Sequence, residues 1–168
     1  TLIFVVRDVI KEFARHGVKK LALIDGHYEN NMFLVEGIDL ALRELRRDGI
    51  DDLRIAKLPY WEYASEETLD KAFPDGFPGW PLEHAGVMET SVMLHLHPEF
   101  VNMDVVPTHP PADFPLHDMY PTDPATVPSS GALSSAASAT PEKGKMFMDE
   151  YVSGAAQALD EAFGEAEN

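Results

Sequence analysis

The 168-residue sequence contains no cysteine, so it can form neither disulfides nor thiolate metal sites. Any metal ligands must therefore be His, Asp or Glu, which suit Zn²⁺, Mn²⁺ or another ion of similar hardness. The sequence also lacks a hydrophobic run of transmembrane length, a P-loop and a dinucleotide-binding glycine motif. Since no signal peptide is visible either, we expect a cytoplasmic protein.

Basic residues are scarce in the second part of the chain. Residues 1–60 hold ten Lys or Arg against ten Asp or Glu, whereas the sequence from Trp61 onward holds three against nineteen. The whole net charge of −16 therefore lies in this second part. Phosphate binding needs clustered Lys and Arg, so we expect no nucleic-acid partner.

The first half of the sequence has the hydrophobic periodicity of alternating helices and strands. Apolar residues recur at helical spacing in two segments, and a short apolar run of strand type follows each of them. Helix, strand, helix and strand joined by short links predict a parallel, buried sheet of the α/β class. The segments are 2–16 (helix), 21–24 (strand), 32–45 (helix) and 53–58 (strand).

The sequence pattern of the second half predicts three helices separated by irregular segments. Ser65 is a suitable cap for the first of them, and Pro141 suits the first turn of the last. The expected helices span 65–73, about 83–96 and 141–163. The segment 98–135 is rich in Pro, Asp, Ser and Thr, and so long a loop is often part of an assembly surface. We expect subunit contacts there.

Three ionisable residues alternate directly after the first predicted strand: Asp25, His27 and Glu29. Ligands collect at the carboxyl ends of parallel strands, and imidazole with carboxylate can bind Zn²⁺ or Mn²⁺. A bound metal lowers the pKa of its water and supplies hydroxide near neutral pH. On the local pattern alone, a purely structural interpretation, in which Asp25 caps a helix and His27 hydrogen-bonds a backbone carbonyl, is favoured over a metal site.

A second candidate group surrounds His84, which follows Trp80-Pro81-Leu82-Glu83 at the predicted start of a helix. A His in this position could transfer protons near neutral pH, although a capping or loop His is an equal alternative. Trp61 and Trp80 are the only tryptophans, and both fall in predicted loops. They are either packing anchors or walls of a pocket. The remaining histidines rank lower: His16, His95, His97, His109 and His117.

Several motifs in one order resemble the creatininase family. The segment 25–30 (DGHYEN) is similar to a characteristic segment of these enzymes, and residues 32–46 continue the likeness without a break. The other matching segments are 60–61 (YW), 76–80 (GFPGW), 83–86 (EHAG), 89–91 (ETS), 109–111 (HPP), 133–135 (LSS) and 142–144 (EKG). The likeness covers essentially the whole chain.

The resemblance implies a three-layer α/β/α fold with a mostly parallel sheet, usually assembled as a homohexamer. It also implies a metal-dependent cyclic amidohydrolase with two divalent ions, Zn²⁺ and Mn²⁺ or Zn²⁺ at both positions. By the same resemblance, His27 would bind one ion and Glu29 the other. Asp25 stands where the family carries Asn and would support the turn.

The reaction implied by the resemblance is attack of metal-bound hydroxide on the cyclic amide of creatinine, which opens the ring to creatine. The implied catalytic residues are His84, Glu29 and Trp61, and the implied substrate-binding residues are Tyr28, Trp80, Pro81 and His84. His84 would move protons, and Trp61 would be a mobile aromatic side chain that closes the pocket.

Two departures from the family pattern qualify these expectations. The remaining family ligands, a Glu, a His and a bridging Asp, belong to a segment that precedes the helix opening this chain. We therefore expect residues 1–168 to form a single creatininase-like domain without the family's N-terminal segment. By themselves, residues 1–168 are expected to bind metal weakly and to be inactive. Pro81 stands where the family has Asp, and it lacks a backbone N–H. Two alternatives therefore remain open. The protein could hydrolyse another small cyclic or formyl amide, or it could be a non-catalytic assembly subunit of the same fold.

Overall fold

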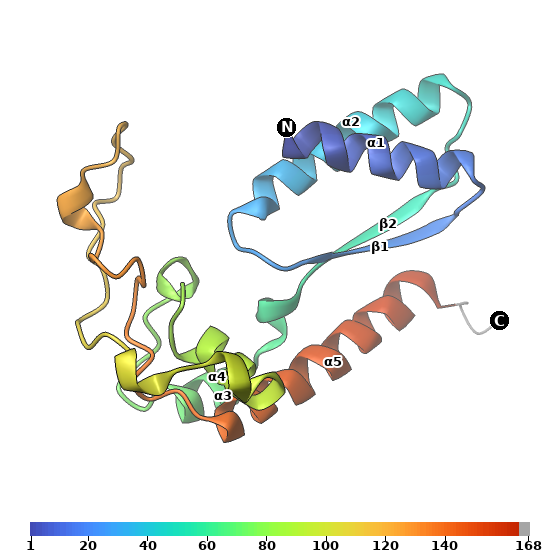
Figure 1. Ribbon diagram of the computed structural model, residues 1–168. Helices are drawn as coiled ribbons and strands as arrows, with labels where there is room; N and C mark the ends of the chain where they lie inside the picture. Colours follow the sequence, from blue (N-terminus) through green and yellow to red (C-terminus); the bar gives the residue numbers. More distant parts are fainter. Residues whose placement is uncertain (165–168) are drawn as a thin grey trace. The chain divides into compact units, whose positions relative to one another are not determined.

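The computed structural model describes residues 1–164 and divides the chain into two compact units (Figure 1). The first unit, here called the sheet unit, comprises residues 1–63 together with residues 153–164. The second, here called the helical unit, comprises Ala64–Val152. Each unit is described by itself.

The sheet unit contains the predicted alternation of helices and strands. Its elements before residue 60 are α1 (Leu2–Arg15), β1 (Lys20–Asp25), α2 (Asn30–Arg47) and β2 (Arg54–Pro59). The two strands pair in parallel, with Lys20 opposite Arg54 and Asp25 opposite Pro59. Because β1 and β2 are in register, both strands end at the same edge of the sheet. The α/β class and the parallel pairing predicted from the sequence are confirmed.

Helices α1 and α2 pack against one face of the strands (Figure 1). The buried core of this layer is formed by apolar side chains from both helices and the loop before β2: Ile10, Ala14, Ala41, Leu45 and Leu53. Gly37 of α2 makes the close approach possible, because a Cβ there would lie 2.8 Å from Val6 of α1. The burial of α1 and α2 against Leu21 and Leu23 holds the carboxyl end of β1 in place.

The opposite face of the strands meets the last turns of α5 (Pro141–Phe163). Lys20 Nζ donates a hydrogen bond of 2.6 Å to the carbonyl of Phe163, and the Arg54 guanidinium lies 5.8 Å from the Phe163 ring. These contacts are at the start of the strands, whereas Ile24, near the end of β1, remains 68% exposed. The expectation of a sheet buried on both faces is therefore wrong at this end of β1.

The helical unit contains α3 (Glu66–Ala72), α4 (Val87–Leu96) and the first half of α5. The predicted cap of α3 is confirmed, since Ser65 Oγ accepts a 3.1 Å hydrogen bond from the N–H of Thr68. Residues 98–135 contain no α-helix and no strand; their only regular elements are three short 3₁₀ turns. Six exposed large apolar side chains belong to this loop: Phe100, Val105, Phe114, Leu116, Met119 and Tyr120.

Helix α4 begins four residues later than predicted. The sequence pattern places its start near Glu83, but Trp80–Leu82 form a separate 3₁₀ turn and α4 starts at Val87. Ala85 has a φ of +54°, a left-handed conformation that interrupts a right-handed helix. His84 therefore lies in a tight turn before α4 and not within its first turn.

Within residues 1–164, no helix is both long and apolar enough to cross a membrane.

Candidate functional site

The carboxyl end of β1 is organised by a buried carboxylate. Asp25 is 1% exposed, and its Oδ1 accepts a 3.2 Å hydrogen bond from the N–H of His27. The N–H of Asn30 donates to the carbonyl of His27 at 3.0 Å, which forms a turn leading into α2. The strand, Asp25 and this turn together determine where the His27 and Glu29 side chains emerge.

His27 and Glu29 lie in direct contact on this turn. Their Nε2 and Oε2 atoms are 2.9 Å apart, with 50% and 66% of the side chains exposed. A nitrogen and an oxygen donor this close can both lie about 2 Å from the same ion or from adjacent ions. The donor chemistry therefore fits Zn²⁺ or Mn²⁺, and this pair could supply two ligands. Among residues 1–164, no group of three His, Asp or Glu side chains is positioned to hold an ion.

Two aromatic residues expected at the site, Tyr28 and Trp61, lie at this turn. The ring of Tyr28 lies 6.2 Å from that of Trp61, in a tilted arrangement. Trp61 follows β2 in a 3₁₀ turn (Tyr60–Tyr63) and is only 5% exposed, packed edge-on against Tyr60 at 5.4 Å. Tyr28 and Trp61 meet because β1 and β2 end side by side. Of the two interpretations of Trp61, packing anchor or pocket wall, the packing anchor corresponds to this conformation.

In the helical unit, Trp80 belongs to a row of aromatic rings. Its ring packs edge-to-face on Phe77 at 4.7 Å, and Phe77 in turn lies 4.9 Å from Phe73. Pro81 follows in the same 3₁₀ turn and is exposed. The segment that looked irregular in the sequence is thus held by ring packing.

His84 lies in the turn between Trp80–Leu82 and α4, and its side chain is exposed. Its carbonyl accepts a 3.1 Å hydrogen bond from the N–H of Leu133, which ties the turn to the long loop. His84 and Glu89 line a cleft of about 680 Å³, whose other walls are largely apolar and include Met93 and Phe100. An exposed imidazole at such a cleft is suitably placed for proton transfer.

Glu83 and Glu89 belong to two of the motifs found in the sequence, but the sequence analysis assigns neither of them a role. Glu83 is 5% exposed, and burial raises the pKa of its carboxyl to about 7, although N–H groups of Met88 and Glu89 donate to it. A buried acid of this kind next to a candidate proton carrier is a typical feature of functional sites. The available signal was its position directly before His84, but its burial depends on tertiary packing.

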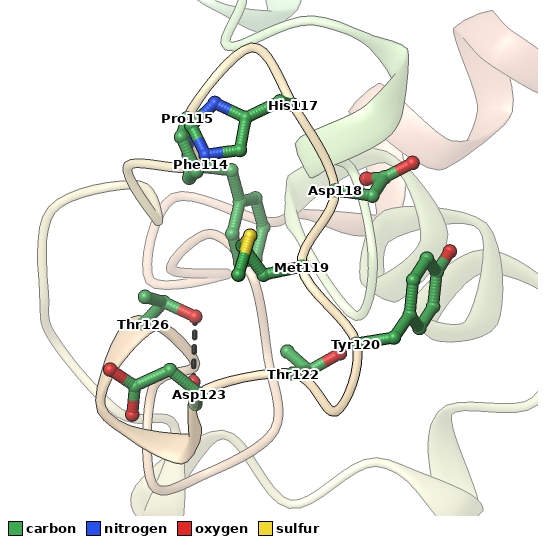
Figure 2. A pocket seen from close by; sticks show the side chains of 9 residues that line it. All are labelled: Phe114, Pro115, His117, Asp118, Met119, Tyr120, Thr122, Asp123 and Thr126. Atoms are coloured by element: carbon green, nitrogen blue, oxygen red, sulfur yellow. Dashed lines mark hydrogen bonds between the residues drawn. The ribbon is translucent and has the colours of Figure 1, made fainter.

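A smaller cavity of about 270 Å³ lies within the long loop, between residues 114 and 126 (Figure 2). Phe114 and Met119 are among the residues that line it, and Thr126 Oγ1 donates a 2.8 Å hydrogen bond to the carbonyl of Asp123. His117 and Asp118 also line it. None of the motif residues contributes to it, so we do not assign the site there.

The structure thus brings His27, Tyr28, Glu29 and Trp61 together in the sheet unit. It brings Trp80, Pro81 and His84 together on one loop of the helical unit. Asp25 has the supporting position expected of it.

Comparison with known proteins identifies relatives of the whole chain. The family model for creatininase, described as creatinine amidohydrolase, matches residues 1–159. Creatinine amidohydrolase of Pseudomonas putida is 51% identical over 164 residues, which are 97% of this chain and 63% of that protein. The chain therefore spans slightly less than two thirds of the length of this relative.

Solved structures give the same result. A Zn-Zn form of a creatininase mutant and a creatininase mutant in complex with creatine each superpose with a TM-score of 0.94 at 49% identity. A manganese form of creatininase superposes with a TM-score of 0.93 at 50% identity. Each match covers 98% of this chain and 64–65% of the other. Together with the family model, these matches show that the chain has the creatininase fold and belongs to the creatininase family.

Proposed function

We propose that the protein containing this chain is a metal-dependent amidohydrolase that converts creatinine and water to creatine. The observation that carries the proposal is the contact between His27 Nε2 and Glu29 Oε2, 2.9 Å apart at the carboxyl end of β1. The 51% identity of the chain with a creatinine amidohydrolase supports the reaction class.

His27 and Glu29 are the residues of this chain that hold the divalent ions, Zn²⁺ and Mn²⁺ or Zn²⁺ at both positions. Solved relatives in Zn-Zn and Mn forms support this choice of metals. When bound, the ions activate a water molecule and polarise the amide carbonyl. Asp25 accepts a hydrogen bond from the backbone N–H of His27 and so holds the backbone of the turn from which the His27 side chain emerges.

In each unit, aromatic side chains adjoin the proposed catalytic groups and offer flat surfaces suited to a small planar substrate. Tyr28 and Trp61 adjoin the metal-binding turn, and Trp80 lies in the loop of His84. Trp61 is the mobile aromatic side chain of this proposal, and its indole N–H has no hydrogen-bond partner among the described residues. A buried donor of this kind gains free energy when it finds an acceptor.

His84 carries the protons. Opening a cyclic amide requires a proton to leave the attacking water and another to reach the departing nitrogen. An imidazole can do both in turn, because it accepts and donates protons near neutral pH. Its exposed position on the cleft of the helical unit leaves the ring accessible to a substrate.

A second candidate substrate class is another small cyclic or formyl amide. The observation that favours it is Pro81, which directly follows Trp80, is exposed and has no N–H to donate to a substrate. A substrate that needs one hydrogen bond fewer in this position would lose nothing by the presence of Pro81.

We also propose that the protein assembles as a homohexamer through the long loop. Several large apolar side chains of this loop are exposed, among them Phe100 at 76%, Val105 at 73% and Tyr120 at 84%. Exposed apolar groups in such number are typical of surfaces that associate.

A substrate panel tests the proposed reaction. The intact natural protein, loaded with Zn²⁺ or Mn²⁺, is expected to release creatine from creatinine with a kcat/KM at least about tenfold above that for formyl amides. Chromatographic detection of creatine and of released formate measures both reactions. The opposite ranking would support the second substrate class, and a Pro81→Ala variant, which regains the N–H, would then raise creatinine turnover. No hydrolysis of any amide would contradict both.

A further inference from the structure

The turn that carries His84 has a strained backbone. Ala85 adopts φ +54°, which non-glycine residues rarely do, and it is the only described non-glycine residue with a positive φ. Backbone strain of this kind persists only where surrounding contacts hold it, and it is concentrated at functional sites. The contacts that hold this turn are therefore informative about the role of His84.

Glu83 holds the turn from its N-terminal side. Its Oε1 accepts hydrogen bonds from the N–H groups of Met88 at 2.5 Å and Glu89 at 3.4 Å, the second and third residues of α4. The first amides of a helix have no intrahelical acceptor. The N-cap residue, Gly86, has no side chain to provide one. Glu83 therefore takes the part of the missing N-cap side chain.

Glu89 holds the same turn in the opposite direction. Its Oε2 accepts a 2.6 Å hydrogen bond from the N–H of Ala85. The two carboxylates thus cross: one reaches forward into α4 and the other reaches back from it, in the manner of a capping box. His84 lies between the anchored residues Glu83 and Ala85, and its own carbonyl is bound by Leu133.

The second oxygen of Glu83 lies behind the turn, next to Ser134. A Cβ on Gly86 would stand 2.6 Å from Glu83 Oε2 and 2.4 Å from Ser134 Oγ, so both atoms surround the same point. Both are buried and have no hydrogen-bond partner among the described residues. This arrangement leaves no room for a side chain at position 86, which explains why a glycine, rather than a capping Ser or Asp, precedes α4.

We propose that Glu83 and Glu89 are positioning residues for His84: their crossed carboxylates hold the turn so that the imidazole stays at the mouth of the cleft. This inference rests on the proposed function of His84 as proton carrier. The ionised form of Glu83 accepts the two α4 amides more strongly than the neutral acid does. We therefore expect the turn to be held best when Glu83 is ionised.

The charge state of Glu83 changes in the range where such an enzyme works. Burial raises the pKa of this carboxyl to about 7, and the neighbouring Glu89 carboxylate adds to the rise, while the N–H groups of Met88 and Glu89 oppose it. Ser134, from the long loop, contributes a neutral hydroxyl. Below pH 7 the Glu83 carboxyl takes up a proton and the hold weakens, so the kcat of the wild type gains an acid limb near pH 7.

The test compares Glu83→Gln and Glu89→Gln with Glu66→Gln in the intact, metal-loaded protein. Glutamine keeps the size and one acceptor oxygen, so the variants are expected to fold. Glu66 is an exposed carboxylate of α3 in the same unit and serves as the matched control. The measurements are kcat and KM for creatinine between pH 5.5 and 9, and hydrogen–deuterium exchange of residues 83–90.

We expect Glu83→Gln to lower kcat about 10- to 100-fold, because small misplacements of a catalytic group are costly. KM is expected to change less than about twofold, and the limb near pH 7 should disappear. Glu89→Gln should also lower kcat and keep that limb, but at lower pH, because the Glu89 carboxylate then no longer raises the pKa of Glu83. Exchange in residues 83–90 should accelerate in both variants, while Glu66→Gln should match the wild type in every measurement.

Two results would overturn the inference. One is unchanged exchange in both variants, which would show that the carboxylates do not hold the turn. The other is faster exchange with unchanged kcat and pH profile, which would leave them a structural role alone. If the wild type hydrolyses no creatinine yet the exchange pattern is as expected, the crossed carboxylates stand and the proposed function fails.

Discussion

Replacing Glu29 by glutamine is expected to lower kcat for creatinine by about 10³-fold or more in the intact natural protein. Glutamine has nearly the same shape, but it carries no negative charge and is a poor ligand for a divalent ion. The Nε2 of His27, 2.9 Å from Glu29 Oε2, would then face a neutral amide. Removal of one charged group at a metal centre typically costs several powers of ten in rate. Steady-state kinetics and metal analysis of the purified variant measure both effects.

His84→Ala separates the role of the metal from that of the proton carrier. It is expected to abolish turnover as well, but with the metal content of the wild type, because His84 is assigned no metal.

Glu36→Gln is the matched control for Glu29→Gln, since Glu36 is an exposed carboxylate on α2 in the same unit. Full activity in both Glu29→Gln and His84→Ala would refute the assigned site.

The second large effect concerns stability. Gly144→Ala is expected to lower the free energy of unfolding by about 3 kcal/mol or more. A Cβ at position 144 of α5 would stand 1.9 Å from the carbonyl oxygen and 2.5 Å from the carbonyl carbon of Ser91 in α4. These are backbone atoms within a helix, so they cannot move aside as a flexible side chain can. Ser91 is fully buried, and its Oγ accepts the N–H of Thr140, which holds the two helices together.

Alanine in an exposed helix is more favourable than glycine by about 1 kcal/mol, so propensity alone predicts the opposite sign. Gly26→Ala is the control, because a Cβ there meets nothing within 4 Å and its φ is not positive. It is expected to change stability by less than about 0.5 kcal/mol. Urea unfolding followed by circular dichroism measures both variants. A Gly144→Ala protein as stable as the wild type would show that α4 and α5 do not approach as described.

The parts of the fold that the sequence predicted are those determined by local periodicity. Ile10 and Leu45 recur at helical spacing with their neighbours, and they are buried where α1 meets α2. His27 and Glu29 were also within reach of prediction, since a single turn after a strand holds both. Local spacing was sufficient in each case.

The parts that the sequence did not predict depend on contacts between distant residues. The start of α4 was placed four residues early because the positive φ of Ala85 is maintained by Glu89 and by the binding of the turn to Leu133. The burial of Glu83 could not be read from its neighbours, since Ser134 lies far along the chain. A carboxylate next to a histidine looks the same in a sequence whether it is exposed or enclosed.

The most direct test of the proposed metal-dependent hydrolysis is creatine formation by the intact protein before and after removal of its divalent ions. We expect activity to fall below about one hundredth after chelation and to return when Zn²⁺ or Mn²⁺ is added back. The Glu29→Gln variant should not recover under the same conditions. Undiminished creatine formation in the metal-free protein would contradict the assignment of His27 and Glu29 as metal ligands of the active site.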